Sequence, residues 1–206
     1  VHGVQPGDLH AADHRVVADR IQAATYLAAV AVSGGEVTLR GACAEHMEML
    51  LRRFHDMGLT VTTVGDGLAV WANGRLRSID VATLPYPGIA TDYKPLIVTM
   101  LSVADGVGIV TENLYPGRLR YVEELQRLGA DIRADGHHAV VRGVPHLSGA
   151  PVRAPDIRAG AALIVAGLAA EGDTTVTGVH HIDRGYDDLV GRLAALGADI
   201  ERVPAS

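Results

Sequence analysis

Hydrophobic residues recur along the chain in a pattern that appears three times. In each copy an aspartate precedes an apolar run of helical length, and a glycine followed by a β-branched run comes after it. The aspartates are Asp19, Asp92 and Asp156, the apolar runs cover residues 20–33, 93–104 and 157–170, and the β-branched runs end near residues 39, 110 and 176. Because the apolar runs are hydrophobic nearly all round, the pattern predicts three buried helices, each followed by a strand.

A second helix is predicted in each copy, with apolar positions spaced between charged ones. These stretches cover about 45–56, 119–128 and 186–196 and end close to Gly58, Gly129 and Gly197. In the third stretch, Leu189, Leu193 and Leu196 are expected to share one face. A glycine at the end of a helix favours a left-handed residue there.

Hairpins are predicted after the second helix in the first two copies only. Asp66-Gly67 lies between alternating runs at 59–64 and 68–71, and Asp135-Gly136 lies between runs at 130–134 and 138–142. Asp-Gly in this setting is a strong hairpin signal. After Gly197 no such pair follows, so the third copy lacks its return strand and leaves a sheet edge or apolar surface open. We expect an additional N-terminal segment to cover it.

The repeat sets the domain organisation that we expect. A period of about 70 residues is long for a solenoid. We therefore predict a single α/β domain over residues 1–206 with three internal repeats, at about 15–82, 83–154 and 155–206, the last incomplete.

Composition narrows the class of protein. With 206 residues and 48% hydrophobic residues the chain can bury a core, and with 4% aromatics that core must consist mainly of Ala, Val, Leu and Ile. The net charge of −6 argues against a nucleic-acid or anionic-membrane partner. One cysteine, Cys43, excludes an internal disulfide framework and a cysteine-based metal site.

The sequence gives little indication of a targeting signal, a membrane span or a metal site. The longest apolar run, at 159–170, is shorter than the roughly 20 residues of a membrane span, and residues 1–8 do not resemble a signal peptide. We therefore expect a cytoplasmic protein. The adjacent histidines at 137–138 and 180–181 are poorly spaced to bind one metal ion, and no metal site or cofactor is predicted.

Five motifs in one order resemble a known family. They are Pro87-Gly88-Ile89-Ala90-Thr91-Asp92, Thr111-Glu112-Asn113, Leu147-Ser148-Gly149-Ala150, Asp156-Ile157-Arg158-Ala159 and His181-Ile182-Asp183-Arg184-Gly185-Tyr186. Together they resemble the C-terminal half of the UDP-N-acetylglucosamine 1-carboxyvinyltransferase family, bacterial enolpyruvyl transferases of peptidoglycan synthesis. The resemblance extends from Arg15 to Val203. It implies an inverse α/β, barrel-like domain of three βαβαββ units that faces a second, N-terminal domain across an active-site cleft.

The resemblance also implies roles for particular residues. By position alone, Asp92 and Asp156 are expected to cap helices. The matching family aspartate of Asp92 binds the sugar 3-hydroxyl and acts as a base. Arg158 would bind the phosphate or carboxylate of phosphoenolpyruvate, with Asp156 a weaker candidate for substrate binding.

Arg184 occupies the family position of an arginine that closes over phosphoenolpyruvate, although a surface Asp-Arg pair such as Asp183-Arg184 usually contributes little. Leu114, Tyr115 and Arg118 match a stretch that contacts the nucleotide sugar. Here the sequence departs from the family, with Tyr115-Pro116-Gly117-Arg118-Leu119 in place of a Phe-Glu-Asn/Ala-Arg-Phe pattern. Lys94 is unusual too, and we expect it to add a cation near the cleft.

These roles imply a reaction and its alternatives. The expected activity transfers enolpyruvate from phosphoenolpyruvate to the 3-hydroxyl of UDP-N-acetylglucosamine and releases phosphate. This half alone is expected to be inactive, because further family residues belong to the missing N-terminal domain. Two alternatives remain open: a paralogous transferase that acts on another nucleotide or on shikimate 3-phosphate, and a non-catalytic module that binds a nucleotide sugar.

Overall fold

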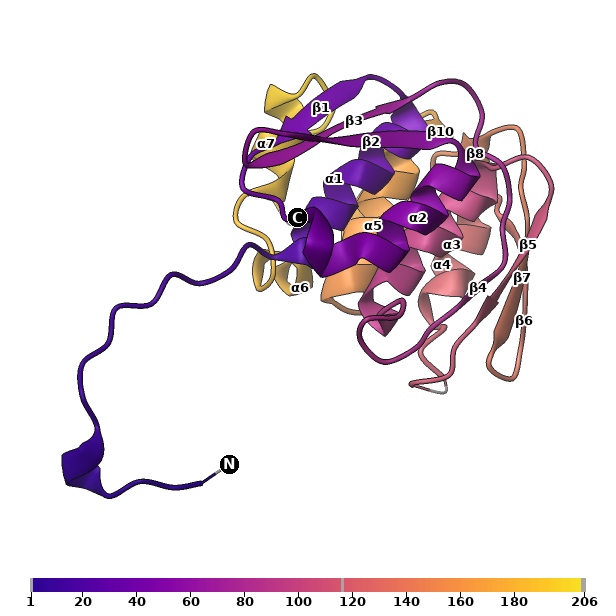
Figure 1. Cartoon of the computed structure of the whole chain (residues 1–206). Helices are drawn as coiled ribbons and strands as arrows, with labels where there is room; N and C mark the ends of the chain where they lie inside the picture. Colours follow the sequence, from indigo (N-terminus) through magenta and orange to yellow (C-terminus); the bar gives the residue numbers. More distant parts are fainter. Residues whose placement is uncertain (1, 116, 205–206) are drawn as a thin grey trace.

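Three helices lie side by side at the centre of the molecule in a computed structural model that describes residues 2–115 and 117–204 (Figure 1). They are α1 (Arg20–Ser33), α3 (Lys94–Val103) and α5 (Ile157–Leu168). Each agrees with a predicted apolar run to within two residues. All three helices contact one another, so the runs that are hydrophobic all round form the core, as predicted.

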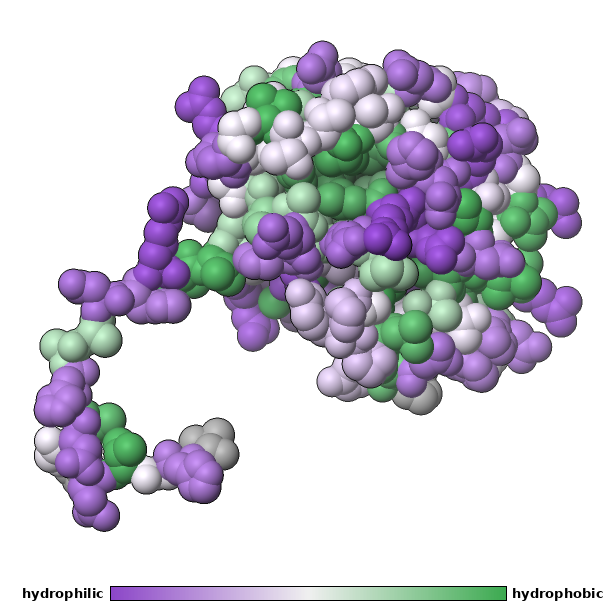
Figure 2. All heavy atoms as spheres, in the orientation of Figure 1, coloured by the Kyte–Doolittle hydropathy of each residue, from purple (hydrophilic) through white to green (hydrophobic). Residues whose placement is uncertain are grey.

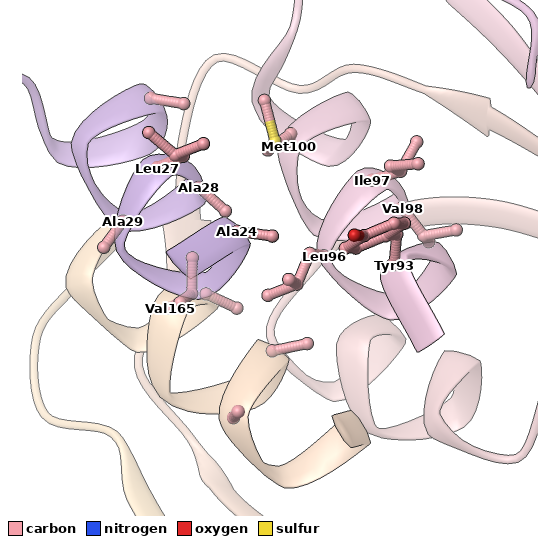
Figure 3. Packing of buried hydrophobic residues seen from close by; sticks show 14 of the residues in the cluster. Ala24, Leu27, Ala28, Ala29, Tyr93, Leu96, Ile97, Val98, Met100 and Val165 are labelled. Carbon is pink, nitrogen blue, oxygen red and sulfur yellow. The ribbon is translucent and has the colours of Figure 1, made fainter. Parts of the chain in front are cut away.

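Small side chains let these helices approach closely. Ala24 and Ala28 of α1, Leu96 of α3 and Val165 of α5 are all buried and lie in the space between the three helices (Figure 3). With few aromatic residues available, alanine and branched aliphatic side chains fill this space, in agreement with the composition. A close-packed interior of this kind is sensitive to a change of one methylene group.

Two sheets flank the central helices (Figure 1). The first has the order β1-β3-β2 and is antiparallel; its strands are β1 (Glu36–Leu39), β2 (Leu59–Val64) and β3 (Gly67–Ala72). The second has the order β4-β5-β7-β6, with β4 and β5 parallel and the rest antiparallel; its strands are β4 (Val81–Ala82), β5 (Val107–Thr111), β6 (Asp131–Asp135) and β7 (His138–Arg142). Helices α2 (Glu48–Met57) and α4 (Tyr121–Arg127) precede the two hairpins. Both predicted hairpins are confirmed.

The turns of these hairpins differ from the prediction by one residue. In the first hairpin Val64 pairs with Gly67, so Gly65-Asp66 forms the turn, and Gly65 supplies the positive φ of 58°. Gly67 belongs to β3, where a Cβ atom would lie 2.1 Å from the carbonyl oxygen of Leu39. In the second hairpin the turn likewise starts at the glycine, Gly136, whose φ is 58°.

The third copy is built differently. Its strands β10 (Ala170–Glu171) and β11 (Thr175–Thr177) pair in parallel with β8 (Leu147–Ser148) and β9 (Pro151–Arg153), respectively, which lie at the end of the second predicted copy. Helices α6 (His180–Asp183) and α7 (Leu189–Ala195) follow. Among the residues described up to 204, no strand follows α7. How the chain divides into repeats at about 82/83 and 154/155 stays a prediction.

The end of the chain differs from the prediction in three ways. A short helix, α6, precedes α7 where no helix was predicted, and α7 begins three residues later than expected. Leu189 and Leu193 are buried, but Leu196 is 54% exposed because it lies after the end of α7 and does not continue its buried face.

The helix ends agree with the sequence at most positions. Asp19 caps α1 and Asp156 caps α5 through their carboxylates. Gly58, Gly129 and Gly197 have φ values of 104°, 87° and 99°, which confirms the left-handed residues predicted there. Two short 3-10 helices, η2 (Ala44–Met47) and η3 (Thr91–Tyr93), lead into α2 and α3.

Residues 2–19 extend away from the body of the molecule (Figure 1). This segment contains a single helical turn, η1 (Pro6–Asp8), and is mostly hydrophilic (Figure 2). Its apolar side chains, among them Leu9, Val16 and Val17, are exposed. Within the described ranges, no helix combines the length and hydropathy that crossing a membrane requires.

Candidate active site

The first turns of the three central helices meet at one end of the core. Arg158, the second residue of α5, bonds to Asp92 just before α3. Arg20, the first residue of α1, has its guanidinium 6.0 Å from the ring of Tyr93, the last residue of η3. Because the start of a helix carries a partial positive charge, this end of the core favours anions.

Asp92 lies at the centre of this arrangement. Its Oδ1 accepts a hydrogen bond of 2.8 Å from Nη1 of Arg118, and its Oδ2 lies 3.3 Å from Nε of Arg158. The Asp92 side chain is about one third exposed. The capping role expected from its position is wrong, because η3 continues directly into α3 and leaves no free start of the helix at Asp92. Its carboxylate therefore faces two arginines and solvent.

Arg158 is held firmly but is not fully bonded. Its guanidinium lies 5.8 Å from the ring of Tyr186, whose hydroxyl is 2.8 Å from Oγ1 of Thr25 on α1. Burial alone would lower the pKa of Arg158, but Tyr186 and Asp92 outweigh it and the net direction is upward. Its Nη1 is buried and has no hydrogen-bond partner among the described residues. An arginine donor left free in this way suits an anionic ligand.

Asp156 uses its carboxylate within the protein. Oδ1 accepts from the backbone N–H groups of Arg158 and Ala159, both at 2.9 Å. The capping role expected from its position is therefore confirmed. By fixing the first turn of α5, Asp156 also fixes the backbone from which Arg158 projects.

The loop that carries Arg184 lies close to Asp92 and its two arginines. The contacts that hold it there come from the neighbouring residues and not from the Arg184 side chain. It follows α6, is exposed, and forms no side-chain hydrogen bond or ion pair within the described part of the chain. The next residue, Gly185, accepts a hydrogen bond of 3.0 Å from Gln22 of α1, and a Cβ atom on Gly185 would meet Ile157 of α5 at 2.5 Å. The loop that carries Arg184 is thus attached to the starts of α1 and α5.

Lys94 differs from the expectation. Its side chain is 0% exposed, and its Nζ lies 2.7 Å from Oε2 of Glu112, itself 1% exposed, and 2.6 Å from the carbonyl oxygen of Arg118. It therefore adds no free cation to the cleft. Lys94 begins α3 and turns inward because Glu112 provides a buried counter-charge. The sequence marked Lys94 as unusual, but nothing in the chain adjacent to it indicated the partner.

Glu112 is a functional candidate to which the sequence analysis gave no role, although it lies in the Thr111-Glu112-Asn113 motif. Burial raises the pKa of its carboxyl, but hydrogen bonds from Lys94, Thr83, Thr91 and Leu114 outweigh burial and lower the pKa to about 2. Burial lowers the pKa of Lys94, and Glu112 opposes that shift. Glu112 thus stays ionised and accepts many donors at once, which is how a buried carboxylate is accommodated.

Leu114 and Tyr115 follow Glu112 and present backbone groups to it. Their N–H groups donate to Oε1 of Glu112 at 2.8 and 3.0 Å. Tyr115 is 61% exposed. Pro116, part of the predicted departure from the family pattern, lies outside the described residues. The side chain of Arg118 returns to Asp92, so this loop ends at the site.

Arg20 also borders the site and was missed. Its guanidinium lies 5.1 Å from the ring of Tyr86 as well as close to Tyr93, and it donates to the carbonyl oxygen of His46 at 3.1 Å. Burial raises the pKa of Tyr93 to about 12, so the phenol stays neutral beside this cation. The only sequence signal was its place directly after the capping Asp19.

The other hollows of the surface add little to this site. One hollow, about 560 Å³, lies along α2 between Ala44 and Asp56 and contains no predicted site residue. A second, about 420 Å³, lies between Arg120, Arg153 and His181, close to the start of α5. Among the described residues, no three His, Cys, Asp or Glu side chains are grouped to hold a metal ion.

Comparison with known proteins identifies the class to which this fold and site belong. Residues 1–193 match the family model described as EPSP synthase (3-phosphoshikimate 1-carboxyvinyltransferase). The chain therefore belongs to the EPSP synthase family. UDP-N-acetylglucosamine 1-carboxyvinyltransferase of Mycolicibacterium paratuberculosis is 51% identical over 195 residues, which make up 95% of this chain and 47% of that protein. The chain thus spans about half the length of the curated relatives that it matches.

Solved structures agree with the predicted fold class. The crystal structure of the enolpyruvyl transferase NikO from Streptomyces tendae superposes with a TM-score of 0.84 at 29% identity, over 93% of this chain and 45% of that one. EPSP synthase from Acinetobacter baumannii has the same fold, with a TM-score of 0.69 at 19% identity over 92% of this chain and 45% of that one. The enolpyruvyl transferase fold expected from the sequence is confirmed.

Proposed function

We propose that this chain forms one half of the active site of an enolpyruvyl transferase. The reaction transfers enolpyruvate from phosphoenolpyruvate to the 3-hydroxyl of UDP-N-acetylglucosamine and releases phosphate. The observation that carries this proposal is the carboxylate of Asp92 between Arg118 and Arg158, at the meeting point of three helix starts. The name of the Mycolicibacterium relative supports the choice of acceptor.

Each group of the cluster has a task in this reaction. The acceptor oxygen forms a bond to the enol carbon of phosphoenolpyruvate, the bond from that carbon to the phosphate oxygen breaks, and the acceptor proton leaves with phosphate. Asp92 is suited to bind the hydroxyl and to accept its proton. Arg158 has a free buried donor for a phosphate or carboxylate. Arg184, exposed on its loop, would close over the same anion, and Leu114, Tyr115 and Arg118 would contact the nucleotide sugar.

The partner that completes the site is a second domain of the same family fold. We infer that the other half of the site, and the cover for the open third copy, come from an N-terminal domain, since the matched relatives are about twice as long. We infer that the reaction belongs to the synthesis of peptidoglycan precursors and takes place in the cytoplasm.

A phosphate-release assay tests this function. The isolated chain with phosphoenolpyruvate and UDP-N-acetylglucosamine is expected to release no phosphate, whereas the chain joined to the N-terminal half of the Mycolicibacterium relative is expected to turn over. Turnover by the isolated chain would refute the divided site. An Asp66→Asn variant, changed in a hairpin turn, serves as the control for Asp92→Asn, which is expected to abolish turnover.

A second acceptor is a specific alternative. NikO is also an enolpyruvyl transferase and superposes well, and the Tyr115–Leu119 stretch departs from the pattern of the family that the sequence resembles. The same assay with other nucleotides and with shikimate 3-phosphate separates these cases. Phosphate release with one of those acceptors, and none with UDP-N-acetylglucosamine, would favour a paralogue.

A further inference from the structure

Glu112 gathers hydrogen-bond donors from three separate segments of the chain. Oε1 accepts from Oγ1 of Thr83 at 2.7 Å and from the N–H groups of Leu114 and Tyr115, and Oε2 accepts from Oγ1 of Thr91 at 2.7 Å and faces Nζ of Lys94 at 2.7 Å. These donors come from the end of β4, from η3, from α3 and from the loop after β5. Because η3 and α3 are continuous, a single buried carboxylate therefore fixes three segments relative to one another.

The buried pair Lys94–Glu112 is connected to both residues of the Asp92–Arg118 ion pair. Thr91, bonded to Glu112, is the residue before Asp92. Lys94, bonded to Glu112, also donates at 2.6 Å to the backbone carbonyl of Arg118, whose side chain binds Asp92. The backbone segments that carry Asp92 and Arg118 are thus connected through the buried charges of Lys94 and Glu112.

We propose that Lys94 and Glu112 are positioning residues, which set the placement of Asp92 against Arg118 and hold the Leu114–Tyr115 backbone where it meets the acceptor. This inference rests on the proposed function, because the residues that it concerns are those assigned to substrate binding. Neither Lys94 nor Glu112 reaches the surface, so both act through other residues.

The competing explanation is that the buried pair only stabilises the fold. The two roles are separable, because a buried ion pair can often be replaced by apolar residues of similar size without loss of stability, whereas removal of one partner leaves an unpaired buried charge. A variant that recovers the wild-type stability but not the wild-type position of the Leu114–Tyr115 loop would reveal a positioning role.

The experiment compares Lys94→Met with the double variant Lys94→Met/Glu112→Leu in the 206-residue chain. Thermal unfolding by circular dichroism measures stability. Backbone amide exchange by NMR at Leu114 and Tyr115, with Val141 in the β6–β7 hairpin as reference, measures loop position. Titration with UDP-N-acetylglucosamine is the ligand readout. The exposed pair Arg52–Glu48, changed to Met and Leu, is the matched control.

A positioning role predicts that the double variant regains melting temperature relative to Lys94→Met. Exchange at Leu114 and Tyr115 is still expected to be faster than in the wild type by at least about tenfold, the equivalent of one or two lost hydrogen bonds. Exchange at Val141 is expected to stay unchanged, and affinity for the nucleotide sugar to stay at least about tenfold weaker. The surface double variant is expected to change none of these.

Two results would overturn the proposal. One is a double variant that recovers the wild-type affinity for UDP-N-acetylglucosamine together with its stability, since exchange at Leu114 and Tyr115 loses its acceptor in that variant under either role; the other is faster exchange that is uniform over the loop and the hairpin. Should the double variant not fold, Glu112→Asp, which keeps the charge and shortens the reach by one methylene, gives the same readouts. A wild-type chain that binds no UDP-N-acetylglucosamine counts against the proposed function, while uniform exchange over the loop and the hairpin still counts against the positioning role.

Discussion

At the scale of single residues, three aspartates that look alike in the sequence have two different environments. Asp19 and Asp156 accept backbone N–H groups at the starts of α1 and α5. Asp92 precedes α3 at the corresponding place but binds two arginines. The difference arises because η3 adds one helical turn before α3 and releases Asp92 from capping.

This difference predicts opposite effects of substitution. Asp19→Ala and Asp156→Ala are each expected to lower the free energy of unfolding by about 1 kcal/mol, because a capped N–H loses its acceptor. Asp92→Asn is expected to change stability little while it weakens ligand binding. Urea unfolding of the three variants checks this; a loss for Asp92→Asn as large as for the capping variants would contradict the assignment.

Arg158 gives a second prediction at this scale. Arg158→Lys keeps the positive charge but removes the planar guanidinium. In the wild type, the Nε of that group contacts Asp92, and its Nη1 has no partner within the described residues and is available to a ligand. The affinity for phosphate, measured by calorimetry, is expected to fall by about tenfold or more, with a small change in stability. Arg142→Lys, which changes an exposed side chain at the end of β7, is the control. Equal affinities of the Arg158→Lys variant and the wild type would show that Arg158 does not bind the anion.

At the scale of elements, close backbone contacts decide where the site residues come to lie. Gly160 on α5 faces α6: a Cβ atom there would lie 2.7 Å from Cγ1 of Ile182 and 2.8 Å from Cβ of Ala154. α6 leads directly to Arg184 and Gly185. The missing side chain at Gly160 therefore lets the loop with Arg184 approach the start of α5.

Gly160→Ala is expected to displace α6 and to destabilise the chain by about 1–3 kcal/mol, the usual result of overpacking. Gly167→Ala, on the same helix, would meet Thr174 at 3.2 Å and is expected to cost less. Both changes gain the same helix propensity, so the difference between them in chemical denaturation reports the packing against α6. A Gly160→Ala variant as stable as Gly167→Ala would show that this contact is not tight.

At the scale of the whole molecule, the buried charges make stability depend on pH. The pKa of Glu112 is about 2 in the folded chain, below its ordinary value of 4.5. The ionised form therefore stabilises the fold above about pH 4.5, and this contribution is lost as the pH falls toward 2. A difference of this size corresponds to on the order of 3 kcal/mol.

The pH dependence is measurable by urea unfolding between pH 7 and pH 2. The wild-type free energy of unfolding is expected to fall along the acid side of this range, and the Lys94→Met/Glu112→Leu variant to lose much of that slope. Glu48→Gln, which removes an exposed carboxylate of a surface pair, is the control and is expected to keep the wild-type slope. A slope unchanged in the double variant would assign the acid sensitivity to other carboxylates.

The sequence predicted the local parts of this molecule better than the contacts between distant parts. Periodicity located the three core helices and both hairpins because those signals lie within a few residues of each other. The Glu112–Lys94 pair and the place of Arg20 between two tyrosines depend on segments that only the fold brings together. The family resemblance predicted roles for Asp92, Arg118 and Arg158. Only the structure shows that both arginines form ion pairs with Asp92.

The most direct test of the central claim, that the starts of α1, α3 and α5 form a substrate site around Asp92, is NMR titration of the 206-residue chain with UDP-N-acetylglucosamine and phosphoenolpyruvate. Saturable shifts are expected at the backbone amides around Asp92, Arg118, Arg158 and Arg184, and Asp92→Asn is expected to remove them. Shifts confined to the hollow along α2, or none at the helix starts, would contradict it.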